Sequence, residues 1–332
     1  MATHLQNGSI NLFYIVWIVA GVGVLIWAWL FIQTPNQAKL ENHIFAPQTI
    51  DPNVLKAAIA LMEDYAKPVV RGRLTNVVPS EETQSFMGGS VYLPKGEAYP
   101  HDSLGDKMVF LIQVNLADTP DLPGLPPVGI IQLFARADCQ LGASANEDVA
   151  FYYWPNPSEL LVRHEPIEID FPEDVLLFRI DRKNGKFDMA GPVDIHRQGR
   201  VVSFEVPVAK HLPSPYDFPV ASRLSDIYGK MADWSHLHSY AKNYNQPADL
   251  TLGGYPVFSQ SDPRFPGLIG EDGMIREDHE KRSAPKFQNN ILTLHSDLKL
   301  MIWDGGTLNL MTQGPALDEG RIQDFLYEVS GH

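Results

Sequence analysis

The sequence predicts an α+β fold: a strand-rich, internally duplicated body with a few helices, preceded by one transmembrane helix. An apolar run without a charged residue, Leu12 to Ile32, predicts the membrane helix. Many short segments of β-branched and aromatic residues, separated by 26 prolines and 25 glycines, predict strands. Helical periodicity is confined to a few segments, so the pattern is not a regular alternation of strands and helices.

The apolar run has the length of a bilayer crossing. As a helix with about 1.5 Å rise per residue it would be about 31 Å long, against about 30 Å of hydrocarbon. A cleaved signal peptide is the alternative, but it needs a basic start and a shorter apolar core. Met1 to Asn11 contains no Lys or Arg. We therefore expect residues 1–11 to be a short polar tail, residues 12–32 to cross the lipid bilayer and residues 33–50 to be a linker.

Basic residues predict the orientation of this span. Lys39, Lys56 and Lys67 follow the apolar run, and no Lys or Arg precedes it. The positive-inside rule therefore favours a cytoplasmic body, and the expected location is the cell membrane, crossed once. The single cysteine, Cys139, excludes an intramolecular disulfide.

Residues 51–332 are expected to form one large domain. The chain is 44% hydrophobic and 10% aromatic, which suffices for a core. Its formal net charge is −14, with 40 acidic and 26 basic residues. A nucleic-acid-binding protein needs a basic patch, so we expect no nucleic-acid partner. The acidity is interpreted as a solubilising surface, with a docking face for a basic partner as the alternative.

The elements of this body follow from local signals. Asp51 as an N-cap and Pro52 in the first turn start a helix, which ends before Pro68. Period-two patterns predict strands over residues 69–78, 89–93, 108–116, 129–135, 150–154, 165–171, 175–180, 201–206, 291–303 and 308–311. A helical stretch is expected over Leu224 to Tyr244, and a closing helix over Arg321 to Val329.

The two halves of the body echo each other. In the first, Gly88-Gly89 is followed by FLIQVNL (110–116) and GIIQLF (129–134). In the second, Gly253-Gly254 is followed by ILTLHSD (291–297) and GTLNLM (306–311). This order predicts a duplicated β unit, although generic strands can resemble each other by chance.

The same segments carry a family resemblance. SFMGGSVYLPKGEAYP (85–100), MVFLIQVNLADTPDLP (108–123), GIIQLFAR (129–136), LGGYPVFSQSDPR (252–264) and ILTLHSDLKLMIWDGG (291–306) resemble the signatures of the YwqG-like bacterial family of unknown function. The resemblance implies a compact, duplicated α+β fold and supplies no catalytic residue. It also implies a protein-binding role, as in toxin-immunity systems. Thr293 and His295 stand where the family usually has Gln and Asp.

The polar faces of the echoed strands are the candidate ligand-binding site. Period two places Gln113 and Asn115 on one face, and Thr293, His295 and Asp297 on another. If the halves are a duplication, these faces could meet across a pseudo-two-fold cleft, with three further polar residues nearby: Gln260, Asp262 and Arg264. Arg264 could bind a carboxylate through two hydrogen bonds. The alternative is a hydrogen-bonded network that fixes turns and register.

Other chemical motifs are weak. His236 and His238 form an H-x-H pair, but the surrounding period is helical and separates the two rings. Cys139 lacks a neighbouring base, and the acidic run 271–280 lacks EF-hand spacing. We expect no metal site and no cofactor.

These observations predict a membrane-anchored, non-catalytic binding module with an unidentified protein partner. A well-patterned fold without a recognisable catalytic set motivates this hypothesis. The alternatives are a hydrolase, or a small-ligand sensor, using a polar cleft between the two half-domains.

Overall fold

The computed structural model describes residues 51–136, 147–167, 195–206, 208–217, 234–246, 248–258, 262–264, 286–296 and 306–331, together with the short pieces 142–144, 181–183, 186–188, 220–221, 223–224 and 302. They belong to a compact unit that spans Pro52–His332, apart from Asp51. The predicted membrane helix, Leu12 to Ile32, lies outside the described residues. Within those residues, no helix is both long and apolar enough to cross a bilayer.

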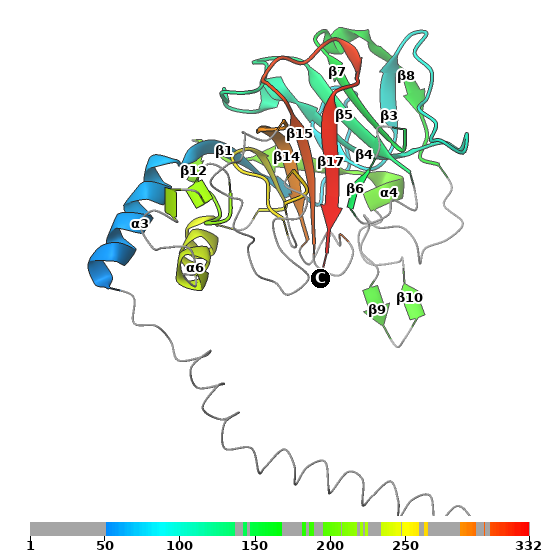
Figure 1. Ribbon diagram of the computed structural model, residues 1–332. Helices are drawn as coiled ribbons and strands as arrows, with labels where there is room; N and C mark the ends of the chain where they lie inside the picture. Colours follow the sequence, from blue (N-terminus) through cyan, green and yellow to red (C-terminus); the bar gives the residue numbers. More distant parts are fainter. Residues whose placement is uncertain are drawn as a thin grey trace, which may run out of the picture. The chain divides into compact units, whose positions relative to one another are not determined.

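The body is built on a 13-stranded antiparallel sheet (Figure 1). Its order is β16-β7-β5-β4-β2-β11-β1-β13-β14-β15-β17-β6, and β12 pairs with β1 beside this path. The strands of this sheet are β1 (Lys67–Leu74), β2 (Phe86–Met87), β4 (Val109–Asn115), β5 (Ile130–Ala135), β6 (Gly142–Ser144), β7 (Val149–Trp154), β11 (Arg200–Phe204), β12 (Ala209–His211), β13 (Leu250–Gly253), β14 (Asn289–His295), β15 (Thr307–Thr312), β16 (Gly320–Ile322) and β17 (Phe325–Ser330).

The remaining elements cover this sheet or connect its strands. Two small antiparallel pairs are β3 (Val91–Pro94) with β8 (Leu160–His164) and β9 (Asp181–Lys183) with β10 (Lys186–Asp188). The helices are α3 (Pro52–Asp64), α4 (Ile195–Gln198) and α6 (Ser235–Tyr244), with 3-10 turns η1 (Leu116–Asp118) and η2 (Pro157–Glu159). The strand-rich body with few helices that the sequence predicts is therefore confirmed.

The two ends of the sheet are brought together. β16 is the edge strand beside β7, whereas β17 lies next to the opposite edge, and only Gln323 and Asp324 separate them in the chain. Phe151 of β7 and Phe325 of β17 pack edge to face, with ring centroids 5.8 Å apart. One face of the sheet thus encloses a single core that both ends share.

The strand order is the same when it is followed from either end. Strands β2, β4, β5 and β7, here called the first half, form a meander. Strands β13, β14, β15 and β17, the second half, form a matching one. Each half is flanked in the sheet by two strands from other parts of the chain. Strands β11 and β16 flank the first half, and β1 and β6 flank the second.

The match extends to single residues. Gly88-Gly89 follows β2 with φ of 66° and 74°, and Gly253-Gly254 at the end of β13 has φ of 70° and 68°. Such φ values are accessible to glycine at little cost. A β-bulge interrupts the β4–β5 register between Phe110 and Ile112, and another interrupts β14–β15 between Asn290 and Leu292. When the two halves are aligned on their Gly-Gly pairs and strand pairing is followed from there, the two bulges occupy equivalent positions.

Helices α3 and α6 pack against each other beside the sheet (Figure 1). Ala58 and Met62 of α3 share a small core with Leu237 and Ala241 of α6. The start of α3 at Pro52 and its end before Pro68 agree with the predicted helix. The first half has its own outer cover, because Val91 and Leu93 of β3 pack with Phe86, Phe110 and Phe134.

Several predicted elements differ from the structure. Residues 165–167 are not in a strand, although one is predicted over 165–171. The closing helix over Arg321 to Val329 is wrong: this segment forms β16 and β17, because Phe325, Tyr327 and Val329 alternate into the shared core. The strand predicted over 291–303 ends at His295. Of the helix predicted over Leu224 to Tyr244, Leu224 and Ser235–Tyr244 are helical, Trp234 lies in a turn, and residues 225–233 lie outside the described residues.

Candidate functional site

In each half, a row of paired side chains that includes polar residues lies on the face of the sheet away from the shared core. Core residues such as Ile112 and Leu133, or Leu292 and Leu310, lie on the inner face. Their strand neighbours lie on the outer face, since side chains alternate across a sheet. Directly paired residues on the outer face form the row Phe86–Gln113–Gln132–Tyr152 in the first half and the equivalent row Thr251–Thr293–Asn309–Glu328 in the second.

In the first half, the predicted residues hold a neighbouring segment of backbone. The Gln113 side chain donates to the carbonyls of Glu82 and Gln84, both at 2.8 Å. Asn115 donates to the Thr83 carbonyl at 2.9 Å and accepts from the Ala117 N–H. These bonds satisfy the buried amide of Gln113 and the partly exposed amide of Asn115, and they fix the chain that leads into β2, as the network interpretation expects.

The hub of the first half is Gln132. Its Nε2 donates to the Tyr92 carbonyl at 2.8 Å and to Gln113 Oε1 at 2.7 Å. Its Oε1 accepts from the indole of Trp154 at 2.7 Å. The outer face around it is otherwise aromatic and covered by β3.

The hub of the second half is Asn309, which is fully buried. Its Nδ2 donates to the Val257 carbonyl and to Glu328, both at 2.7 Å, and its Oδ1 accepts from the Val257 N–H and from Thr293, both at 2.9 Å. Val257 and Tyr92 occupy equivalent positions, three residues after the second glycine of each pair. A side-chain amide therefore donates to a backbone carbonyl at the same position in both halves.

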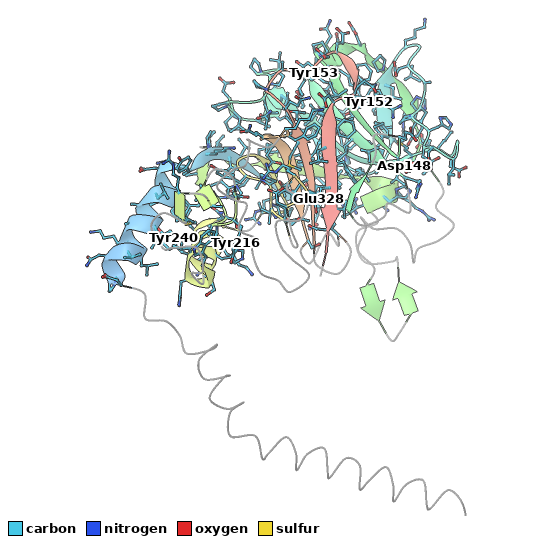
Figure 2. All side chains as sticks on the ribbon, viewed as in Figure 1. Asp148, Tyr152, Tyr153, Tyr216, Tyr240 and Glu328 are labelled. Carbon is cyan, nitrogen blue, oxygen red and sulfur yellow. The ribbon has the colours of Figure 1, made fainter. Side chains whose placement is uncertain are left out.

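The two outer faces differ in character beyond these hubs. We define the second-half polar face as Thr251, Thr293, His295, Thr307, Asn309, Glu328 and Ser330. The first-half equivalents of Thr251, Thr307 and Ser330 are Phe86, Ile130 and Trp154. Tyr152 of the first half is likewise equivalent to Glu328 of the second, and both residues are labelled in Figure 2.

Ionisation on the polar face is shifted towards neutral forms. Burial raises the pKa of Glu328 to about 7, and nearby Asp262 adds to the rise, against hydrogen bonds from Asn309 and Ser330. Burial lowers the pKa of His295 to about 4. The His295 Nε2 lies 3.3 Å from the Thr251 hydroxyl. At neutral pH the imidazole is therefore uncharged and the Glu328 carboxyl is partly protonated.

Arg264 and Asp262 form a buried ion pair with each other. The Arg264 Nε lies 2.9 Å from Asp262 Oδ1, and Nη2 lies 2.6 Å from Oδ2. Arg264 also donates to the Phe287 carbonyl and lies over the Phe258 ring. The carboxylate that Arg264 binds in this bidentate way thus belongs to its own turn.

A second group of ionisable residues adjoins this pair. We define the Lys67 cluster as Lys67, His211, Asp217, Tyr255, Asp262 and Arg264. The Lys67 ammonium lies 4.3 Å from the centre of the Tyr255 ring. The Tyr255 N–H donates to His211 Nδ1 at 3.1 Å, so this imidazole is an acceptor there.

Burial dominates the electrostatics of the Lys67 cluster. It lowers the pKa of Lys67, raises that of Asp217 to about 7 and lowers that of His211 to about 3. Arg264 counteracts the rise at Asp217 and adds to the fall at Lys67. Lys67 and Arg264 thus place two cationic groups near Asp217, whose carboxyl can be protonated near pH 7.

The structure separates the eight predicted site residues into three sets. Gln113 and Asn115 lie on the outer face of the first half, and Thr293 and His295 on the outer face of the second. The shared core lies between these faces, so they do not face each other. Asp262 and Arg264 adjoin the second set through Glu328, whereas Gln260 and Asp297 lie outside the described residues.

Sequence reasoning missed the residues that come from distant elements, Lys67, His211, Asp217, Asn309 and Glu328. Asn309 had a signal, since it echoes Gln132 in GTLNLM and GIIQLF. Of the other motifs, His236 and His238 are exposed on α6. Cys139 and the acidic run 271–280 lie outside the described residues. Among residues that are described, no three His, Cys, Asp or Glu side chains form a metal-binding group.

The chain belongs to the family described as "Domain of unknown function (DUF1963)", which matches residues 85–330. This range contains both halves of the sheet and the second-half polar face. A comparison with curated proteins finds no match.

Proposed function

We propose that this DUF1963 protein is a membrane-tethered, non-catalytic binding module. The proposed binding site centres on the partly buried His295 and Lys67, and it adjoins the other side chains of the second-half polar face, which are buried. The observation that carries this proposal is the contrast between the two outer faces, which are equivalent in topology but differ in polarity around the shared amide hubs.

The first half demonstrates that the fold does not require a polar outer face. At equivalent positions it holds Phe86, Ile130 and Trp154, which pack under β3. The second half holds Thr251, Thr307 and Ser330 there. Burying hydroxyl and carboxyl groups costs free energy unless each one is hydrogen-bonded. Polarity that folding does not need supports a ligand or partner that uses it.

The equivalence of the halves supports an internal duplication as its origin. Strand order, Gly-Gly conformation, bulge position and the amide hubs Gln132 and Asn309 all correspond. After such a duplication the two outer faces diverged, so that aromatic side chains predominate on the first and polar ones on the second.

The membrane tether and the cytoplasmic side of the body are proposed from the sequence alone. Leu12 to Ile32 supports the span, and Lys39 and Lys56 after it support the orientation. A reporter that is active on only one side of the membrane, fused to the C-terminus, tests the orientation. Activity only on the outer side would overturn it.

Capture from native membranes tests the binding module. Full-length wild type should retain a reproducible partner, and Lys67→Gln with His295→Gln should lose it, because both partly buried side chains belong to the proposed binding site. Lys56→Gln is the matched control, since Lys56 is exposed on α3. The proposal fails if wild type retains no reproducible partner, or if the double variant retains the same one.

One observation favours a hydrolase as the second candidate. The Thr251 hydroxyl lies 3.3 Å from His295 Nε2, a nucleophile next to a base. Turnover of an activated ester such as p-nitrophenyl acetate by wild type, abolished in both Thr251→Val and His295→Gln, would support it. Equal rates in all three proteins would dismiss this candidate.

A further inference from the structure

A buried arginine without a counter-ion lies at the start of β11. Arg200 is 5% exposed. Its Nη1 donates to the Gly199 carbonyl, and its Nη2 lies 3.2 Å from Gln198 Oε1. Its Nε has no hydrogen-bond partner. In the part of the chain that the structure describes, no carboxylate forms an ion pair with this guanidinium.

The position of Arg200 in the sheet is a core position. Arg200 pairs with Met87, and the same inner row continues through Ile112, Leu133 and Phe151, all members of the shared core. The equivalent row of the second half is Val70–Leu252–Leu292–Leu310–Tyr327. Arg200 therefore stands where the other half has Val70, which is 1% exposed.

A guanidinium at such a position needs an explanation. Arginine stays protonated in proteins, so it cannot escape burial by losing its charge as a lysine can. An unpaired buried charge is strongly unfavourable, and a carbonyl and an amide oxygen compensate it only in part. The equivalence with Val70 shows that the fold itself does not require a charge here.

The backbone around Arg200 is held firmly. The Gly89 N–H donates to the His196 carbonyl at 2.8 Å, and the Gly199 N–H donates to the Ile195 carbonyl at 2.9 Å. A Cβ on Gly199 would lie 2.9 Å from the Gly88 oxygen, so these segments pack backbone to backbone. The guanidinium is thus presented from a rigid support.

We propose that Arg200 binds the carboxylate or phosphate group of a small molecule. The Nε and Nη2 hydrogens share one edge of the guanidinium, and that edge matches two oxygens of an oxyanion. Nε is unused, and Nη2 makes only the 3.2 Å contact with Gln198, whose residue is exposed. Rotation of the Gln198 side-chain amide would present its NH2 group as a further donor to the same oxyanion. This site is independent of the second-half polar face.

Thermal unfolding of the full chain in a non-ionic detergent tests the site. Sodium chloride is replaced stepwise by sodium acetate, or by sodium phosphate, at constant ionic strength and pH. Wild-type Tm should rise and saturate with at least one anion, because a ligand that binds only the folded state stabilises it. Arg200→Met should show no anion-specific rise. Arg197→Gln, three residues earlier and exposed, should respond like wild type.

The Tm values in sodium chloride alone distinguish a guanidinium that awaits an external ligand from one that an internal group already neutralises. In chloride alone, Arg200→Met should melt at the wild-type temperature or above it, since replacing an uncompensated buried charge by an apolar side chain is not destabilising. A rise with acetate alone identifies a carboxylate ligand, and a rise with phosphate alone a phosphate ligand. The proposal is overturned if wild type responds to neither anion, if Arg200→Met responds equally, or if Arg200→Met melts several degrees lower in chloride.

Discussion

At the residue scale, two side-chain amides perform the same task in the two halves. Gln132 and Asn309 each reach across the outer face and bind the carbonyl of the residue three positions after a Gly-Gly pair. A buried amide must satisfy its donors and acceptor, and in both halves covering backbone supplies the partner. Asn309 makes four hydrogen bonds, two with the backbone of Val257 and two with the side chains of Thr293 and Glu328.

Asn309→Ala is expected to destabilise the fold by about 3 kcal/mol, because each buried group left unpaired costs about 1–3 kcal/mol. Equilibrium urea unfolding of the full chain measures the effect. Asn243→Ala is the control, since Asn243 is exposed on α6 and its loss should cost less than about 0.5 kcal/mol. Equal midpoints for the two variants would contradict the role of Asn309 as a hub.

Glu328 should make the stability of the fold depend on pH. Its pKa is raised from 4.5 to about 7, so between these values the folded state binds more protons than the unfolded state. By linkage, its contribution to stability is present at low pH and is lost as pH rises through this window. Glu328→Gln should abolish this part of the fall, and its Tm should exceed that of wild type above pH 7.

Melting curves of wild type and Glu328→Gln from pH 4 to pH 8 measure this difference. Asp217 also has its pKa raised to about 7, so the variant keeps a smaller slope of the same sign. The two curves should converge at the acidic end and separate towards pH 7. Parallel curves over the whole range would refute the assignment of the shift to Glu328.

At the scale of elements, strong local patterns were sufficient for most strands and failed at the chain end. The strands at 109–115, 130–135, 149–154 and 307–312 lie where period two predicts them. The C-terminal segment contains Ile322, Phe325 and Val329 at helical spacing, which favours a helix. Its alternation of Phe325, Tyr327 and Val329 prevails, because a strand there pairs with β15 along its whole length.

The Gly-Gly turn after β2 tolerates little change at Gly88. A Cβ on Gly88 would lie 2.1 Å from the Ile195 carbonyl oxygen, and its φ is 66°. Gly96 also has a positive φ, 95°, but nothing lies within 4 Å of a Cβ there. Gly88→Ala should therefore lower Tm far more than Gly96→Ala, which bears only the backbone cost of about 1–2 kcal/mol. Similar Tm losses in the two variants would show that the contact with Ile195 can relax.

At the scale of the whole molecule, sequence reasoning identified a repeated strand pattern but not which residues the folded sheet brings together. Thr293 and His295 were placed on one polar face, and the structure confirms that they share it. Lys67 and Asp217 come from separate segments of the chain, so no local pattern links them. Glu328 was assigned to a helix, which concealed its place in the polar row. Pairing between distant strands decides these contacts, and single-sequence periodicity carries no information about it.

The proposed membrane tether is tested at this same scale, by removing it. The apolar run Leu12 to Ile32 has no charged residue, and Lys39 and Glu41 cancel within residues 1–50. Residues 51–332 therefore carry the whole −14 net charge and would be repelled by anionic lipid. Deleting residues 1–50 should therefore move the protein from the membrane pellet to the supernatant after ultracentrifugation. Replacing only Val22 and Leu25 by Arg tests the span itself, since a charge at the bilayer centre opposes insertion by about 2.5–3.5 kcal/mol. A carbonate-resistant pellet for the deletion variant would show that the body binds the membrane without Leu12 to Ile32.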